Sequence, residues 1–195
     1  MSVPAEEKLG RADGPDKTTK IAKTVYEYAE TIAAAVCVVF LIFNFLARTS
    51  VVSGSSMEKT LSDGDVLLVS SLPYEPKQGD IVVFRAPYSE FFGDELLIKR
   101  VIAVGGQEIM IDFDTWRVTV DGKDVDEAEY LYLHGVAKTS QIQFPFTVPE
   151  DKVFVMGDNR YNSYDSRYTD IGAVDEDYIL GPAILRLYPT LGAIG

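Results

Sequence analysis

Histidine, cysteine and basic residues are scarce in this chain, and each shortage excludes a class of function. A single histidine, His134, and a single cysteine, Cys37, leave no His/Cys cluster for zinc, and one cysteine cannot form an intramolecular disulfide. The 30 acidic residues outnumber the 18 basic ones, which gives a net charge of −12. This acidity argues against binding of nucleic acid, whose phosphates need a basic surface, and against electrostatic adhesion to anionic lipid. Any attachment to a membrane must therefore be hydrophobic.

The shortage of histidine also limits how a serine could act as a nucleophile. His134 has no acid at triad-like spacing, so we expect a surface or packing role for it, and the chain has no G-x-S-x-G motif. Residues 52–61 place small side chains around Ser56, and Gly54 permits a sharp backbone turn. This composition suits a nucleophile, although a Gly/Ser linker after a membrane segment has the same composition. If Ser56 is a nucleophile, a buried neutral lysine is the main alternative to an imidazole base.

One long apolar run lies near the N-terminus, between Thr31 and Ala47. With the residues just before it, the run predicts a transmembrane anchor over residues 25–48. A cleavable signal peptide is disfavoured because no good small-x-small site follows the run. A buried core helix is disfavoured because the run is apolar all round. The polar residues 1–24 predict a disordered cytoplasmic tail.

The basic residues that flank the anchor predict its orientation. Lys17, Lys20 and Lys23 precede the apolar run, and Arg48 follows it. By the positive-inside rule, the N-terminus lies in the cytoplasm and residues 49–195 lie outside the cell membrane. We therefore expect a single-pass protein that contacts membrane lipid through one helix.

Short apolar runs bounded by turn residues dominate the chain after the anchor and predict a mainly β fold. Strands are expected at residues 66–69, 81–84, 98–104, 108–111, 117–120, 153–156 and 179–187. The pair Asp121-Gly122 predicts a hairpin. No run after the anchor keeps a 3.6-residue apolar period, so long helices are not expected there. Residues 107–151, acidic and irregular from 121 onward, are interpreted as a cap or insertion.

Two adjacent cations, Lys99 and Arg100, lie inside one of these apolar strands. Alternation places them on opposite faces, so one of them must point toward an apolar side. A lysine buried in this way loses the hydration of its charged form, which lowers its pKa, and its neutral amine can accept a proton from serine. The alternative is an edge strand whose lysine reaches solvent along its aliphatic stem.

A polar segment, residues 157–167, follows the strand at 153–156 and reads Gly-Asp-Asn-Arg-Tyr-Asn-Ser-Tyr-Asp-Ser-Arg. Its two aspartates and two arginines suit an internal ion-pair network that holds neighbouring groups in register. The oxygens of Asp158, Asn159 and Asp165 could also ligate a metal. The spacing does not fit an EF-hand, and the two arginines disfavour a cation, so no metal is expected.

Four motifs follow one another in the order found in the type I signal peptidases, which this chain therefore resembles. They are Ser56-Met57-x-x-Thr60-Leu61, Gly79-Asp80-Ile81-Val82-Val83-Phe84, Lys99-Arg100 with Gly105-Gly106, and residues 157–167. The set covers most of the chain after the anchor, and the last motif is highly specific. These enzymes are membrane-bound serine proteases that remove signal peptides from exported proteins. The resemblance implies an antiparallel β catalytic domain on an N-terminal helix, of the single-anchor form found in Gram-positive bacteria.

The resemblance also implies a role for individual residues. Ser56 would be the acylated nucleophile and Lys99 the general base, with Ser163 donating a hydrogen bond to the Lys99 amine. The further supporting residues would be the ion pair of Asp165 and Arg167, together with Asp158, Arg160 and Gly54. The substrate would be a preprotein with small side chains at the −1 and −3 positions. The pockets for these side chains are expected near Val51, Val52, Leu61, Leu97 and Ile98, and no cofactor is implied.

The chain departs from the family pattern at three places. Lys59 stands where the family usually has proline, so the turn after Ser56 loses a fixed φ. Residues 103–107 replace the usual Gly-x-Pro-Gly-Asp. Gly54 stands where some members carry a serine that assists the oxyanion hole, which would leave more of that task to the Ser56 N–H, helped by Ser55 or water.

Two other functions fit parts of this pattern. A self-cleaving Ser/Lys regulator of the SOS-repressor type shares the chemistry, but such proteins carry a DNA-binding domain where this acidic chain has an apolar run. A catalytically impaired, membrane-tethered module for binding exported chains is favoured by Lys59. The presence of Ser56, Lys99 and Ser163 favours the enzyme.

Overall fold

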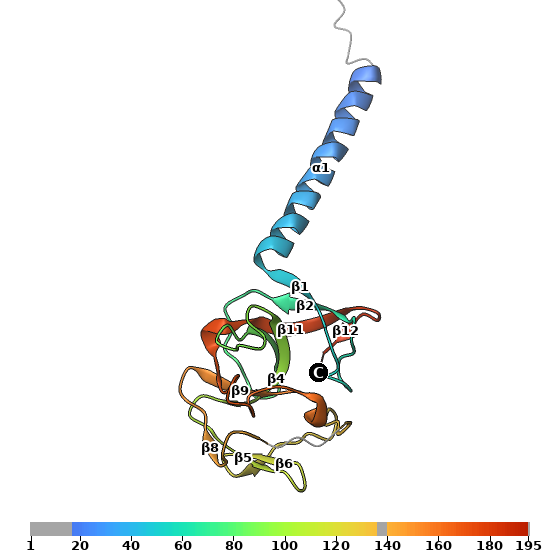
Figure 1. Ribbon diagram of the computed structural model, residues 1–195. Coiled ribbons are helices and arrows are strands. Elements are labelled where there is room, and N and C mark those ends of the chain that lie inside the picture. Colours follow the sequence, from blue (N-terminus) through green and yellow to red (C-terminus); the bar gives the residue numbers. More distant parts are fainter. Residues whose placement is uncertain (1–16, 136–139, 195) are drawn as a thin grey trace, which may run out of the picture. The chain divides into compact units, whose positions relative to one another are not determined.

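The computed structural model describes residues 17–135 and 140–194, and the chain divides into two compact units, residues 1–42 and 43–195. Helix α1 (Lys17–Phe45) accounts for all described residues of the first unit (Figure 1). Its segment Ile21–Leu41 has a mean hydropathy of 1.5 and is long and apolar enough to cross a membrane. None of this segment is buried against protein, unlike the core helix considered as an alternative.

The boundaries of the helix differ from those expected from the sequence. Residues 17–24, expected in the disordered tail, are helical, since no glycine or proline interrupts the chain between Pro15 and Phe45. Residues 1–16 of the expected tail lie outside the described residues. At the other end, the helix stops before Arg48, which pairs with Val69 in a β-ladder instead of ending the anchor.

The second unit is built from two antiparallel sheets, which confirms the mainly antiparallel β fold. The larger, eight-stranded sheet has the order β1 (Ala47–Val51), β2 (Val66–Ser70), β11 (Ile179–Tyr188), β3 (Ile81–Arg85), β4 (Leu96–Val104), β9 (Lys152–Met156) and β10 (Val174–Asp175), and β12 (Gly192–Ala193) pairs with β11. The four-stranded sheet has the order β7 (Lys123–Asp124), β6 (Arg117–Val120), β5 (Glu108–Asp112) and β8 (Phe146–Thr147). Two 3₁₀ turns, η1 (Arg160–Asn162) and η2 (Glu176–Tyr178), are the only helical turns described after Phe45.

Each strand expected from the sequence is present, with ends shifted by a residue or two. The hairpin at Asp121-Gly122 is also confirmed, because it joins β6 to β7 with φ values of 50° and 72°. Both angles are positive, as a two-residue hairpin turn requires. The strands not expected are β1 and the two-residue strands β7, β8, β10 and β12.

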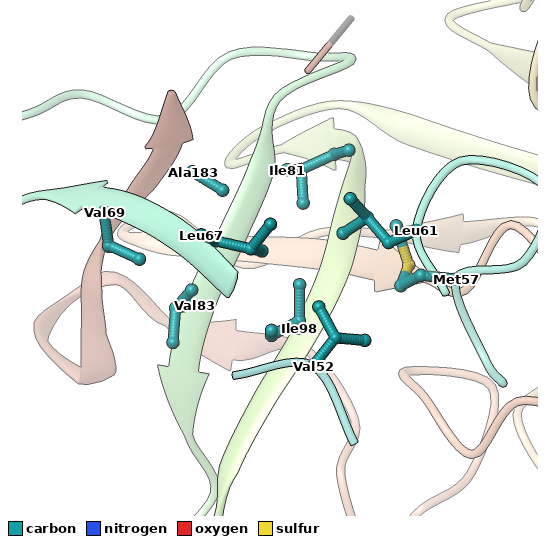
Figure 2. Close-up of a cluster of buried hydrophobic side chains, with 9 residues drawn as sticks. All are labelled: Val52, Met57, Leu61, Leu67, Val69, Ile81, Val83, Ile98 and Ala183. Atoms are coloured by element: carbon teal, nitrogen blue, oxygen red, sulfur yellow. The ribbon is translucent and has the colours of Figure 1, made fainter. Parts of the chain in front are cut away.

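A cluster of buried apolar side chains joins the Ser56 turn to the larger sheet (Figure 2). Met57 and Leu61, on the turn after Ser56, are 1% and 0% exposed and pack with strand residues that include Leu67 and Ile98. Burying a side chain of this size contributes about 1.5–3 kcal/mol. The core therefore holds the turn that carries Ser56 against the strand that carries Lys99.

The strands within residues 107–151, the range interpreted as a cap or insertion, share a core with the larger sheet. Their inward side chains form a core with side chains of β4 and β9, among them Ile109, Ile111, Val118, Val120, Phe154 and Met156. Short alternating strands can pack either on a lid of their own or on a sheet elsewhere in the chain, and the sequence pattern is the same for both. The smaller sheet is thus a second layer of the β unit, residues 43–195.

Candidate active site

Ser56 lies in the loop between β1 and β2, which is closed at its base by backbone hydrogen bonds. The Val52 N–H donates to the Asp65 carbonyl over 2.8 Å, and the Gly64 N–H donates to the Val52 carbonyl over 3.0 Å. Gly64 adopts a φ of +86°, which favours glycine. These bonds extend the β1–β2 ladder and set where the loop leaves the sheet.

Lys99 lies on β4, and its amine meets the hydroxyl of Ser56. The Lys99 Nζ lies 2.8 Å from Ser56 Oγ and donates to the Ile98 carbonyl over 3.1 Å. The Lys99 residue is only 4% exposed. The two residues that the sequence singled out for chemistry are therefore in direct contact.

Burial changes the proton affinity of this amine. Loss of hydration lowers the pKa of Lys99 to about 8. The Asp165 and Asp158 carboxylates raise the pKa and the Arg167 guanidinium lowers it, and all three effects are smaller than that of burial. A substantial neutral fraction of the amine therefore exists near neutral pH, as a general base requires.

One edge of β4 is open beside this pair. Strand β3 pairs with β4 from Leu96 to Arg100, whereas β9 pairs with it only from Arg100 onward. Among the strands that the structure describes, none covers the second edge of β4 between Leu96 and Lys99. Unpaired backbone groups at such an edge can bind an extended peptide.

The loop of residues 157–167 contacts the Ser56 turn through three hydrogen bonds. The Asn159 N–H donates to the Ser56 carbonyl over 3.0 Å, and the Asn159 Nδ2 donates to the Ser55 carbonyl over 3.2 Å. The Asn162 Nδ2 donates to Ser55 Oγ over 2.5 Å. A Cβ on Gly157 would lie 2.5 Å from the Ser56 carbonyl oxygen, so only glycine fits at this contact.

Ser163 lies in this loop, but its described hydrogen bond differs from the one expected. Its hydroxyl donates to Asp165 Oδ2 over 2.6 Å instead of reaching the Lys99 amine. Asp165 also accepts the Gly157 N–H over 3.0 Å and forms a buried ion pair with Arg167, whose Nε lies 2.8 Å from Asp165 Oδ1. Burial would raise the pKa of Asp165, but these partners, Arg167 foremost, bring it down to about 2. Asp165 therefore stays ionised and takes the hydrogen bond of Ser163.

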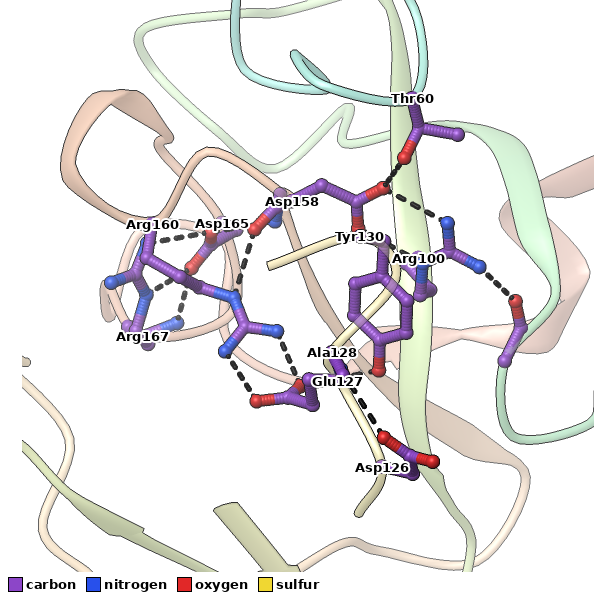
Figure 3. Close-up of polar contacts among 12 residues, drawn as sticks. Thr60, Arg100, Asp126, Glu127, Ala128, Tyr130, Asp158, Arg160, Asp165 and Arg167 are labelled. Carbon is purple, nitrogen blue, oxygen red and sulfur yellow. Dashed lines mark hydrogen bonds and ion pairs between the residues drawn. The ribbon is translucent and has the colours of Figure 1, made fainter. Parts of the chain in front are cut away.

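Asp158 has partners that sequence reasoning missed (Figure 3). Its carboxylate accepts two bonds of 2.9 Å from the Arg100 guanidinium and one of 2.5 Å from the Thr60 hydroxyl. The third arm of Arg100 donates to the Gly79 carbonyl over 2.8 Å. The sequence signal that could have predicted a buried partner for Arg100 was alternation along β4, because alternation puts Arg100 on the face opposite Lys99. Both faces prove to be buried, so both cations need partners inside the protein.

Arg160 is fully buried and pairs with Glu127, which no sequence motif had singled out. The two Arg160–Glu127 bonds measure 3.0 and 2.5 Å. The Arg160 Nε donates to the Gly157 carbonyl over 3.0 Å. The aspartates that had been considered as metal ligands, Asp158 and Asp165, are each occupied by an arginine.

Two hollows adjoin Ser56 and Lys99, and they contain some of the expected substrate pocket residues. The smaller, about 40 Å³, is lined by Val52, Ser53, Ser56, Met57 and residues 96–99, which include Leu97 and Ile98. The larger, about 380 Å³, is lined by residues 53–56, Phe92, residues 95–97, Lys99, Asn162 and Tyr164. Val51 and Leu61 line neither, because Val51 is 62% exposed on the other face of its strand and Leu61 belongs to the core. A hollow of about 900 Å³ elsewhere contains neither Ser56 nor Lys99.

The departures from the family pattern have local substitutes in the structure. The turn after Ser56 is closed without proline, since the Thr60 and Leu61 N–H groups both donate to the Met57 carbonyl, over 2.9 and 2.8 Å. The Lys59 amine donates to the Ala128 carbonyl over 3.3 Å. Gly54 has a φ of +85° and its N–H donates to Asp63 Oδ1 over 2.7 Å.

Comparison with known proteins identifies the family of the chain. The family described as signal peptidase, peptidase S26, matches residues 25–188. Signal peptidase I T of Bacillus subtilis is 37% identical over 187 residues, which cover 89% of this chain and 91% of that protein. The probable signal peptidase I-2 of Synechocystis is 34% identical over 189 residues, which cover 94% of this chain and 82% of that protein. A crystal structure of a signal peptidase I from Enterococcus faecalis aligns over 57% of this chain and 98% of that one, with a TM-score of 0.44 and 26% identity.

The matched range includes most of helix α1 and nearly all of the β unit, with the Ser56 turn, strand β4 and the loop of residues 157–167 inside it. The chain therefore belongs to the signal peptidase family, peptidase S26, whose members are serine peptidases that cleave signal peptides.

Proposed function

We propose that this chain cleaves the signal peptides of exported preproteins with Ser56 as the nucleophile and Lys99 as the general base. The observation that carries the proposal is the 2.8 Å contact between the Ser56 hydroxyl and a buried lysine amine. No imidazole serves as the base, because the only histidine, His134, is exposed and stacks on Tyr132. The contact satisfies the geometric requirement for proton transfer between nucleophile and base.

The reaction proceeds through an acyl-enzyme. The neutral Lys99 amine takes the proton of the Ser56 hydroxyl as Oγ attacks the scissile carbonyl carbon. The resulting ammonium gives that proton to the leaving amine as the peptide bond breaks. Lys99 then takes a proton from water as the water oxygen attacks the ester carbonyl, and the ammonium returns that proton to Ser56 Oγ as the ester bond breaks and the acid product leaves. Burial of Lys99 supports these steps because it favours the neutral amine between them.

The oxyanion that forms during attack is bound by the Ser56 backbone N–H and the Ser55 hydroxyl. Among the described hydrogen bonds, the Ser56 N–H has no acceptor. The Ser55 Oγ already accepts from Asn162 Nδ2, over 2.5 Å, and its own proton is therefore available for an acceptor in the cleft. Ser55 lines the larger hollow together with Ser56 and Lys99. This arrangement supplies a second donor in a chain that has glycine at position 54.

The substrate binds as an extended strand along the open edge of β4, between Leu96–Lys99 and Ser53. Backbone groups hold the strand, and the hollows beside it select its alternate side chains. The smaller hollow, about 40 Å³, has room for little more than one water molecule or a methyl group. A substrate with small residues at the −1 and −3 positions fits this space.

The anchor places the active site outside the cell membrane, with the N-terminus in the cytoplasm. The positive-inside charge pattern and the exposed apolar segment Ile21–Leu41 support this orientation. Lipid is contacted through this one helix. The preprotein and the enzyme are thereby confined to one membrane, which raises the effective concentration of the substrate.

Cleavage of a defined preprotein tests this proposal. The full chain in detergent is incubated with a preprotein whose signal ends in Ala-x-Ala, and the product masses locate the cut. We expect a single cut after the second alanine, no cut with tryptophan at that position, and no cut by Ser56→Ala. Cleavage that continues in Ser56→Ala would refute the assignment, and a folded wild type without cleavage would favour a binding module.

A further inference from the structure

A short strap in the chain between β7 and β8, residues 127–132, contacts each of the elements that support the active site. Its anchor is Glu127, which is 6% exposed and accepts both terminal nitrogens of Arg160. The strap is folded back on itself by the N–H groups of Tyr130 and Leu131, which donate to the Glu127 carbonyl over 3.2 and 2.8 Å. Figure 3 shows the Glu127 carboxylate facing the Arg160 guanidinium across the loop.

The backbone of the strap also pairs with the loop of residues 157–167. The Tyr132 N–H donates to the Asp158 carbonyl, and the Arg160 N–H donates to the Tyr132 carbonyl, both over 2.9 Å. These two bonds form an isolated parallel bridge between Tyr132 and Asn159. Asn159 is the residue whose own N–H holds the Ser56 carbonyl. One short segment thus contacts the loop through two backbone bonds and one buried ion pair.

The strap reaches the other two elements of the site through Tyr130 and Ala128. The Arg100 guanidinium, on β4, lies 4.0 Å from the centre of the Tyr130 ring, an arrangement that stabilises the cation. The Tyr130 hydroxyl donates to Glu127 Oε1 over 3.2 Å. The Ala128 carbonyl accepts the Lys59 amine of the turn that follows Ser56.

The contacts lead from Glu127 to the nucleophile in two steps. Glu127 fixes Arg160, and the Arg160 Nε donates to the Gly157 carbonyl over 3.0 Å. Gly157 packs so closely on its neighbours that a Cβ there would lie 2.5 Å from the Ser56 carbonyl oxygen and 2.3 Å from Ser163 Oγ. Gly157 therefore packs directly against the backbone of the residue that carries the nucleophile.

We propose that Glu127 is a positioning residue for the Ser56–Lys99 pair, acting through Arg160 and the Gly157 carbonyl; this inference rests on the proposed function of that pair. Glu127 touches neither reacting atom, and no strap residue lines the hollows beside Ser56. Loss of the Glu127 charge leaves Arg160 buried without its counter-ion, so the guanidinium moves away from Gly157. The chemical step depends on the geometry of the pair, whereas substrate binding does not use the strap.

The test compares full-length variants in detergent by two readouts. One is the rate at which a serine-directed β-lactam probe acylates Ser56 as its ring opens, and the other is kcat and KM for an Ala-x-Ala preprotein, per active site. We expect Glu127→Gln to lower the acylation rate and kcat by about 10- to 100-fold, with KM within about twofold. The matched control is Asp124→Asn, which breaks an exposed ion pair with Arg117 and should leave both rates unchanged.

A double variant separates positioning from simple stability. In Glu127→Leu/Arg160→Met, an apolar pair replaces a buried ion pair, which commonly preserves stability. We expect a melting temperature near that of the wild type but a low acylation rate, because no N–H then holds the Gly157 carbonyl. Wild-type acylation by either Glu127→Gln or a stable double variant would overturn the proposal.

The two readouts also separate this inference from the proposed function. If the probe acylates wild-type Ser56 but the preprotein is not cut, the substrate assignment fails while the effect of Glu127 is still measured. If the probe does not acylate the folded wild type, the Ser56–Lys99 pair is not reactive and the positioning role fails with it.

Discussion

At the residue scale, the chemistry that we propose depends on a buried amine beside a serine hydroxyl. Lys99 has apolar neighbours on its strand, and its described hydrogen bonds run to Ser56 and to a backbone carbonyl instead of a carboxylate. Asp165, which could have formed an ion pair with the amine, is held by Arg167 and Ser163. Burial lowers the pKa of this amine, and no carboxylate binds the ammonium form directly to offset that effect.

The lowered pKa of Lys99 predicts how activity depends on pH. The base works only when neutral, so kcat/KM should rise with pH through the pKa of about 8 and level off above it. The profile is measured on a peptide substrate without ionisable groups in this range. A limb near the ordinary lysine value of about 10.4, or a flat profile between pH 6 and 9, would contradict the assignment.

The oxyanion proposal predicts the effect of removing one hydroxyl. Ser55→Ala deletes a donor that acts only on the charge developed during attack, so kcat should fall by about 10- to 1,000-fold with little change in KM. Steady-state kinetics on one preprotein measure both constants. An unchanged kcat would leave the Ser56 N–H as the sole protein donor.

At the scale of elements, three ion pairs buried at the site hold the loop of residues 157–167 against its surroundings. Asp165–Arg167 lies within the loop, Asp158 ties it to β4, and Arg160 ties it to the strap. In each pair both residues are at most 6% exposed. Such pairs add little net stability, but breaking one leaves an uncompensated buried charge.

Removal of one partner therefore has a large predicted cost. Asp158→Asn leaves Arg100 without its bidentate acceptor, and we expect the free energy of unfolding to fall by about 3–5 kcal/mol. The exposed pair of Arg117 and Asp124 supplies the control, because Asp124→Asn should cost less than about 1 kcal/mol. Urea unfolding measures the free energy of unfolding of both variants. Equal decreases in the two variants would contradict the role given to burial.

The sequence predicted these elements unevenly, for physical reasons. The strands at β4 and β9 carry long apolar runs, and the Asp121-Gly122 turn has a strong local preference, so both could be predicted. The two-residue strands β8 and β10 depend on partners far along the chain and leave no local pattern. Strand β12 pairs with the neighbouring strand β11, but its two residues are too short for an alternating pattern. Strand β1 was missed because its residues, Ala47–Val51, follow directly on the apolar helix.

The candidate site shows the same division. Ser56 and Lys99 stood out by residue type and apolar context. The partner of Arg160 did not, because Glu127 lies in an irregular acidic segment where nothing local marks one carboxylate as buried. In place of the hydrogen bond expected between Ser163 and Lys99, the Ser163 hydroxyl donates to Asp165, a charged acceptor two residues away in the same loop.

At the scale of the whole molecule, the apolar helix and the β unit perform separate tasks. The β unit, residues 43–195, contains the Ser56–Lys99 pair, the three core clusters and the loop of residues 157–167. The helix contains the one described segment that can cross a membrane. In the function that we propose, the second unit carries the chemistry and the first confines the chain to the membrane.

This separation predicts the behaviour of a truncated chain. Residues 43–195 alone should cleave a soluble peptide with the kcat/KM of the full chain, because the catalytic pair and its supports are all present. On a preprotein in lipid vesicles, the full chain should be about 100-fold more efficient, since both partners share one membrane. Equal efficiency of the two forms in vesicles would show that the anchor does not concentrate the substrate.

The most direct test of the Ser56–Lys99 pair is the kcat/KM of four full-length proteins on one Ala-x-Ala preprotein: wild type, Ser56→Ala, Lys99→Ala and the control Lys123→Ala, which alters an exposed lysine. Circular dichroism establishes that each is folded. We predict wild-type activity in the control and a loss of about 1,000-fold or more in each of the other two variants. Activity retained in folded Lys99→Ala would contradict the assignment of Lys99 as the base.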